Sequence, residues 1–334
     1  TMKTKKTVFI MLLLALHILC PNNIYSKSPE KVNEQWQKTI LAAVDSFPEK
    51  GGYYVGRKTT ADFPKSAWRA MNEAFIMYYS DFKPSFNPQK AQPSFCSMAT
   101  YAALLKALIM WDSENKFPRQ AWYCLKPLVG VADNMNSRGY NQKDGEGCWG
   151  RANANGPGLA VLVNELKAGV NFHGYRGAKT EALRENAKER YLSDDEWRAD
   201  PVWDEAIPGD FMKIFWNRNE TNGSDSGAVI GENSDPNAEQ EHGHSVIFMG
   251  YTEDGKVKYW SSNGPGENPK EAGYGIGICD KTRIQRVVIT RITNPDNFAN
   301  AKKITPVTKN KWLVSLAGEK HGTTQELKKE CGIK

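Results

Sequence analysis

Apolar residues in the first third of the chain recur every three or four positions, which is the spacing of one buried face of an α-helix. One such set lies at 36–44 and a second at 68–78, so each predicts a helix. The segment 96–111 is apolar on nearly every face and predicts a helix buried at the centre of the fold. The proline-rich stretch 84–93 is expected to form the loop before it.

The middle of the chain has a different pattern. Residues 112–208 are polar and rich in turn residues, and they predict one further helix, between Pro157 and Gly169. The charged run 179–200 is expected to be a solvated helix with no function of its own.

After residue 208 the helical spacing gives way to short runs of β-branched and aromatic residues separated by Gly, Asp and Asn. Glu253-Asp254-Gly255 predicts a hairpin turn between the second and third runs. Helices followed by an antiparallel sheet predict an α+β fold. The predicted strands are Phe211–Trp216, Ser245–Tyr251, Lys256–Ser262, Tyr274–Cys279 and Ile284–Ile292.

The first residues resemble a secretory signal. Three lysines at 3–6 precede a short apolar run at 8–16, which is too short to span a bilayer comfortably. We therefore expect residues 1–26 to be removed on export to the periplasm or the exterior of a bacterium. Lipidation of Cys20, which would tether the protein to a membrane, is the less favoured alternative because Leu19 is bulky for that processing site.

The charge of the chain points to no special partner. The net charge is +6, and loss of the three signal lysines leaves +3. Such a value favours no nucleic acid and at most a loose association with an anionic surface. No second apolar run of spanning length follows the signal, so the mature chain is expected to be soluble or tethered only at its front.

Five cysteines remain after the signal: Cys96, Cys124, Cys148, Cys279 and Cys331. An odd number in an exported chain fits one free thiol with up to two disulfides, and it fits five free and buried thiols equally well. No Cys/His cluster has the spacing of a structural zinc site, and we expect no metal or other cofactor.

Three residues carry the candidate chemistry. Cys96 opens the central helix, where the helix dipole favours the thiolate. His244 begins a strand and supplies an imidazole as the proton acceptor. If 253–255 is the turn, position 244 lies opposite about position 264, so Asn263 falls close to His244 and is suited to orient its ring.

These residues resemble the papain-like cysteine hydrolases, and among them the NlpC/P60 and CHAP group of bacterial wall hydrolases. The resemblance rests on Cys96, on the Pro-Gly-Asp turn at 208–210, on His244 and on Asn263, and it covers residues 92–111 and 206–292. It implies a nucleophile helix packed on an antiparallel sheet, with extra N-terminal helices and a long middle insertion. It also implies thiolate attack on an amide through an acyl-enzyme.

The chain departs from that group in two respects. NlpC/P60 members usually have Asp before the nucleophile, where this chain has Phe95, and the 148 residues from Cys96 to His244 are closer to the interval of papain. The resemblance to papain suggests Gln92 as the oxyanion donor, although its spacing from the cysteine differs. The backbone N–H of Cys96 is a donor in either case.

The resemblance also sets the expected organisation and function. It divides the chain into an N-terminal helical region at 27–91, a catalytic domain at 92–315 with an insertion at about 112–205, and a tail at 316–334. The expected substrate is an amide bond in peptidoglycan peptides. A papain-type general endopeptidase and a non-catalytic wall-binding module on the same fold are the alternatives.

Several residues offer competing interpretations. Cys148, followed by Trp149, is a rival nucleophile, although no apolar helix begins there. His242 and His244 with Glu241 would make a metal pair, but a third soft ligand is missing. Trp216 and Trp260 are expected to be core aromatics rather than substrate platforms. His173 and His321 are expected to have packing roles, and Asp210 is expected to stabilise its turn.

Overall fold

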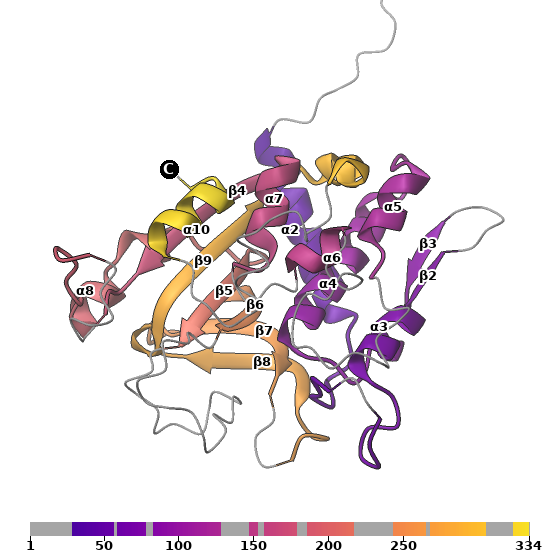
Figure 1. Cartoon of the computed structure of the whole chain (residues 1–334), viewed down its shortest axis with the longest axis horizontal. Helices are drawn as coiled ribbons and strands as arrows, with labels where there is room; N and C mark the ends of the chain where they lie inside the picture. The colour runs from indigo at the N-terminus through magenta and orange to yellow at the C-terminus, as the bar shows by residue number, and fades with distance from the viewer. Residues whose placement is uncertain are drawn as a thin grey trace, which may run out of the picture.

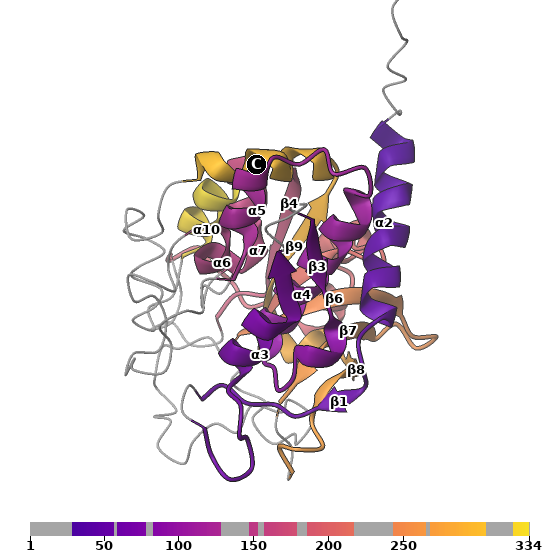
Figure 2. The same cartoon turned by 90° about the vertical axis from the view of Figure 1, so that its right-hand side faces the viewer.

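The α+β fold is confirmed by the computed structural model, which describes residues 29–56, 59–77, 83–127, 147–152, 157–178, 186–216, 243–264, 268–304 and 323–333. A seven-stranded antiparallel sheet has the order β1-β8-β7-β6-β5-β9-β4. Helices gather mainly on one of its sides (Figures 1 and 2). The strands are β1 Lys50–Gly51, β4 Gly169–Tyr175, β5 Phe211–Trp216, β6 Gly243–Tyr251, β7 Val257–Asn263, β8 Gly273–Cys279 and β9 Ile284–Ile292.

A separate two-stranded hairpin joins β2 Phe75–Met77 to β3 Pro84–Phe86. The helices are α2 Pro29–Asp45, α3 Ala67–Ala74, α4 Cys96–Trp111, α5 Arg119–Leu125, α6 Gly147–Ala152, α7 Leu159–Leu166, α8 Asp194–Arg198 and α10 Thr324–Cys331. Short 3₁₀ turns lie at Pro88–Lys90, Pro201–Glu205, Lys281–Arg283 and Pro295–Lys303. None of the helices in the described ranges is long and apolar enough to cross a membrane.

Helix α4 is the centre of the larger core, as predicted. It packs against α2 and against β6 and β7 (Figure 1), and nearly all of its side chains are buried. Alternation along β6 turns Ile247 toward this core, whereas Val246 and Phe248 belong to a second core on the other face of the sheet, together with Trp197 of α8. The sheet therefore has a hydrophobic layer on each side.

The sequence pattern predicted the C-terminal half closely. The five predicted strands correspond to β5 to β9, and the turn before Lys256 is confirmed by a backbone hydrogen bond from the Thr252 N–H to the Lys256 oxygen (3.0 Å). The helices predicted from the sets at 36–44, 96–111 and 157–169 are present as α2, α4 and α7.

Two predicted helices are wrong in extent. The helix at 68–78 ends at Ala74, because Phe75–Met77 pairs with β3 and its large apolar residues suit an extended strand. In the described part of 179–200, only the five residues of α8 are helical. That helix begins at the Ser193 capping box and is followed by the 3₁₀ turn at Pro201, and its Trp197 is fully buried rather than solvated.

The middle region is more ordered than its polar composition suggested. It supplies β4, which pairs with β9 along its whole length, and α7, which packs on both strands. The stretch 84–93 contains β3 and a 3₁₀ turn rather than a plain loop. All five cysteines after residue 26 are free, which agrees with the second of the two cysteine alternatives in part, because Cys96 and Cys124 are half-buried and only the other three are buried.

Candidate active site

Cys96 is the first residue of α4 and is half-buried. Phe95 occupies the N-cap in an extended conformation and offers no side-chain cap, so the first-turn N–H groups of α4 have no intrahelical acceptor. The N-terminus of a core helix thus presents the thiol together with the first backbone N–H groups of α4.

Three groups hydrogen-bond to the sulfur of Cys96. They are the His244 side chain, the backbone N–H of Ser245 and the hydroxyl of Tyr53. Because a backbone N–H lies in the plane of its sheet, the bond from Ser245 places the sulfur beside β6 rather than above it. This position allows His244 to reach the sulfur although the neighbouring even-numbered residues of β6 face the core opposite to α4.

A second hydrogen bond orients the imidazole. His244 Nε2 lies 3.1 Å from Asn263 Oδ1, and Asn263 Nδ2 donates to the Gly275 carbonyl at 3.0 Å. The second bond fixes the amide so that Oδ1 is the acceptor, and His244 Nε2 therefore carries the proton. Nδ1 is left for the sulfur, which is the arrangement that a proton acceptor for Cys96 requires.

A β-bulge sets the register that joins these two side chains. Near the turn, Tyr251 pairs with Val257, and this register would place residue 264 opposite His244. Pairing shifts by one residue between Phe248 and Gly250, after which Ile247 pairs with Trp260. Continued to the open end of the hairpin, the shifted register puts Asn263 directly opposite His244 and on the same face.

Aromatic rings enclose the imidazole. The ring of Trp216, at the end of β5, stacks on His244 with centroids 6.1 Å apart, and Tyr259 contacts it edge-on at 5.7 Å. His244 is 8% exposed as a result. Trp216 is half-buried, and it covers the imidazole of His244 in addition to packing against the second core.

The environment of Cys96 favours the thiolate. Burial alone raises the pKa of the thiol. The hydrogen bond and charge of His244 outweigh burial, with help from the positive charge of Lys213 and the Ser245 N–H, and the pKa of Cys96 is lowered to about 6. At neutral pH the sulfur is therefore mainly the nucleophilic thiolate.

Tyr53 and Lys213 were not predicted from the sequence. Tyr53 lies in a segment that forms a β-bridge with Ser94, immediately before α4, and its N–H donates to Pro269 O at 2.9 Å. Burial, followed by the negative charge of Cys96, raises the pKa of Tyr53, so its hydroxyl remains a proton donor. A tyrosine in a Gly-Gly-Tyr-Tyr run has no local pattern that marks it as a site residue.

The structure brings Cys96, His244 and Asn263 together but gives Gln92 other neighbours. Gln92 Nε2 donates to the Gln89 carbonyl at 3.0 Å, and its side chain lies against the backbone of Gly51. Among the described residues, no hydrogen bond joins Gln92 to Cys96. Its oxyanion role stays a prediction, and Tyr53 is the side-chain donor beside the sulfur.

The other residues considered as functional candidates lie in surroundings that are typical of structural roles. Cys148 lies in α6 with no exposed surface, and burial raises its pKa. The carboxylate of Asp210 accepts from Arg291 (Nη2 to Oδ2, 2.8 Å) and from the Ile207 N–H (3.0 Å), which stabilises the Pro-Gly-Asp turn. The residues that the structure describes contain no cluster able to hold a metal ion, and Cys20, Glu241, His242 and His321 lie outside them.

A search of protein-family models, of curated proteins and of solved structures found no match to this chain. The function proposed below therefore rests on the chemistry of the site and on the N-terminal sequence.

Proposed function

We propose that the protein is an exported cysteine hydrolase that cleaves amide bonds, with Cys96 as nucleophile, His244 as general base and acid, and Asn263 as the residue that orients His244. The observation that carries the proposal is the continuous hydrogen-bonded series from the Cys96 sulfur through the imidazole to the Asn263 amide. These groups come from α4, β6 and β7, and they make up the set that thiol-based acyl transfer needs.

The reaction follows from the positions of these groups. The Cys96 thiolate attacks the amide carbonyl carbon, a sulfur–carbon bond forms and the carbonyl oxygen becomes an oxyanion. The Cys96 N–H and the Tyr53 hydroxyl, both next to the sulfur, donate to that oxygen. The protonated His244 gives its Nδ1 proton to the leaving amine as the carbon–nitrogen bond breaks. Water, deprotonated by His244, then hydrolyses the thioester and restores the thiolate.

The fold is proposed to be papain-like. In support, a buried helix begins with the thiol and packs on two antiparallel strands that bear the imidazole and the amide. An aromatic ring, Trp216, also covers the histidine. The chain departs from the NlpC/P60 pattern at Phe95, whose apolar side chain is buried and packs against the ring of Trp68.

Peptidoglycan peptide is the proposed substrate. The lysines and apolar run of the first residues favour export from a bacterial cell, where wall peptides are the abundant amide substrate. A thiolate that forms at near-neutral pH suits an extracytoplasmic enzyme that has no cofactor to activate its nucleophile.

The test is digestion of purified peptidoglycan by the mature protein, with released stem-peptide fragments identified by mass spectrometry. Cys96→Ala should reduce release by at least about a thousandfold while leaving the circular dichroism spectrum unchanged, because nucleophile loss removes the covalent route. Cys124→Ala is the matched control, since it removes another half-buried free thiol. Cleavage of an unstructured protein but not of peptidoglycan would indicate a general endopeptidase, and full activity of Cys96→Ala would refute the mechanism.

A further inference from the structure

A buried lysine lies beside the proposed nucleophile, and the described part of the chain places no carboxylate next to it. Lys213, on β5, is 5% exposed and pairs in register with Ser245 of β6. Its Nζ donates to Ser245 Oγ at a long 3.4 Å, and the Phe215 ring lies 5.9 Å away. Within the described residues, no Asp or Glu is in ion-pair distance of Lys213.

An uncompensated buried ammonium is costly, because burial favours the neutral amine. Burial lowers the pKa of Lys213, and the nearby Cys96 thiolate acts in the opposite direction. An ammonium has three donors, and a single long bond to a hydroxyl leaves most of that capacity open. The side chain is therefore suited to an anionic group that arrives from outside.

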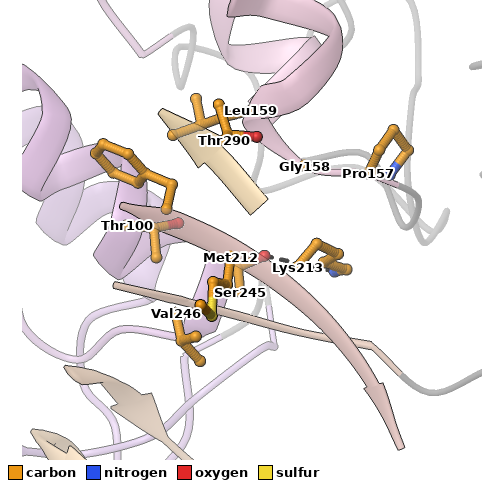
Figure 3. Close-up of a pocket in the computed structure, with 10 residues that line it drawn as sticks. Thr100, Pro157, Gly158, Leu159, Met212, Lys213, Ser245, Val246 and Thr290 are labelled. Atoms are coloured by element: carbon orange, nitrogen blue, oxygen red, sulfur yellow. Dashed lines mark hydrogen bonds between the residues drawn. The ribbon is translucent and has the colours of Figure 1, made fainter. Parts of the chain in front are cut away.

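A helix N-terminus faces the same place. Lys213 lines a pocket together with Pro157, Gly158 and Leu159, the residues at the start of α7 (Figure 3). The Gly158 N-cap has no side-chain cap, and a methyl group added to it would lie 3.8 Å from Ser245 Oγ and 3.9 Å from Lys213 Cδ. The ammonium and the backbone at Gly158 and Leu159 thus border one small space, and both favour negative charge. The next N–H of α7, that of Ala160, donates to the Pro157 oxygen at 3.2 Å.

The pocket adjoins the nucleophile and is narrow. Thr100, one turn after Cys96 in α4, and Thr290 of β9 complete its polar lining (Figure 3). It has room for about one water molecule, so it accommodates a carboxylate oxygen but not a ring or a branched side chain. Ser245 links the pocket to the reaction centre, since its hydroxyl accepts from Lys213 and its N–H donates to the Cys96 sulfur.

We propose that Lys213 and the N-terminal amides of α7 form a subsite for a carboxylate of the peptide substrate. Because Ser245 touches both Lys213 and Cys96, the bound carboxylate lies near the scissile carbonyl. The inference rests on the proposed hydrolase function and adds substrate selection to it. The carboxylate belongs either to the C-terminus of the substrate or to an acidic side chain next to the cleaved bond.

The experiment compares matched peptides that differ only in this group. Three substrates are used: one with a free C-terminal carboxylate next to the cleaved bond, one with an acidic side chain there and an amidated C-terminus, and one with carboxamides at both positions. We expect the wild type to cleave at least one acidic peptide with a kcat/KM about tenfold above that of the neutral peptide. The preferred acidic peptide identifies the source of the carboxylate.

Lys213→Met should lower kcat/KM for both peptides, because Lys213 also favours the Cys96 thiolate. It should lower kcat/KM about tenfold further for the acidic peptide, by raising its KM, so that the preference disappears. Lys256→Met, at the exposed hairpin turn, is the control for loss of one positive charge and should retain the preference. Lys213→Gln repeats the test if the methionine variant fails to fold. Equal loss on acidic and neutral peptides would overturn the subsite and assign Lys213 to the thiolate alone.

A binding measurement separates this inference from the proposed function. Calorimetry with Cys96→Ala, which cannot form the acyl-enzyme, should give a Kd about tenfold lower for the acidic than for the neutral peptide. The difference should disappear in the Cys96→Ala, Lys213→Met double variant. Acid-selective binding without hydrolysis by the wild type would leave the subsite standing and refute the hydrolase. Hydrolysis by the wild type without acid preference in either measurement would refute the subsite and leave the hydrolase standing.

Discussion

Cys96 and Cys148 both lie in the first turn of a helix, yet the structure gives their sulfurs opposite properties. Cys96 begins α4, and Cys148 is the second residue of α6. The pKa of Cys96 is lowered to about 6, whereas burial raises that of Cys148 beyond the range of any physiological pH. A position at the start of a helix therefore does not decide whether a cysteine is reactive.

The difference lies in the neighbouring groups. The Cys96 sulfur has an imidazole, a backbone N–H and a nearby ammonium, all of which favour negative charge. Cys148 is surrounded mainly by hydrocarbon and aromatic rings. They include Trp149, whose ring contacts that of Tyr101 in an edge-on arrangement. Arg151 favours the Cys148 thiolate, but Glu165, which is ion-paired with Arg151, opposes it.

The comparison teaches that the pKa of each thiol here depends on long-range contacts. His244 and Lys213 lie more than a hundred residues from Cys96 in the sequence, and only the sheet brings them together. The helix dipole contributes at both cysteines, so its effect is smaller than that of the partners.

The largest expected effect is on thiol alkylation. At pH 7, Cys96 is about nine-tenths thiolate, so iodoacetamide should modify it at least about a thousandfold faster than Cys148. Mass spectrometry of the native protein between pH 4 and 9 should show the Cys96 rate rising with a midpoint near pH 6 and then levelling. This direction follows because the thiol loses its proton as the pH passes its pKa.

Cys124 serves as an internal reference for that measurement, because burial raises the pKa of this half-buried thiol. A Cys96 midpoint near 9.0, the ordinary value for a thiol, would contradict the proposed role. So would equal labelling of Cys96 and Cys148 in the folded protein.

The second-largest expected effect is a rise in the pKa of Cys96, which would bring its thiol closer to the unreactive state of Cys148. His244→Ala removes the largest influence that lowers the Cys96 pKa, so the pKa should rise from about 6 toward the ordinary value of 9.0. The alkylation rate at pH 7 should then fall by about a hundredfold, because the thiolate fraction falls in that proportion. The measurement is the same pH series on the variant.

His173→Ala is the matched control, since it also removes an imidazole with little solvent contact, a half-buried one that lies on β4 and not at the site. An unchanged midpoint in His244→Ala would show that Lys213 and the Ser245 N–H hold the thiolate without the imidazole. A shifted midpoint in His173→Ala would indicate a general loss of structure.

Local patterns predicted much of the fold. The apolar faces of α2, α4 and α7 and the strand runs of β5 to β9 are periodic in the sequence, and tertiary packing uses the same periodicity. The edge strand β4 escaped prediction because Gly169–Tyr175 is a mixed run with glycine and histidine, and its conformation depends on pairing with β9. At Phe75–Met77, pairing with β3 overrode a helical spacing for the same reason.

At the site, the sequence identified Cys96, His244 and Asn263 but not how the last two meet. Simple counting from the turn placed residue 264 opposite His244, which would turn Asn263 to the other face of the sheet. The bulge near Gly250, whose φ is 114°, corrects the register by one residue. Lys213 was hidden as one polar residue in an apolar strand, since only the fold shows which cation lies near the sulfur.

The smallest expected effect concerns Cys148 itself, and it is on stability rather than chemistry. Cys148→Ala removes a fully buried sulfur from a core that also contains Tyr101 and Trp149, so the free energy of unfolding should fall by about 1 to 2 kcal/mol. Urea unfolding should show a lower midpoint with an unchanged slope. Because Cys148 takes no part in the hydrogen bonds of the Cys96 sulfur, alkylation of Cys96 should stay within about twofold of the wild-type rate, and a larger loss would mean that the two helix starts are coupled through the core.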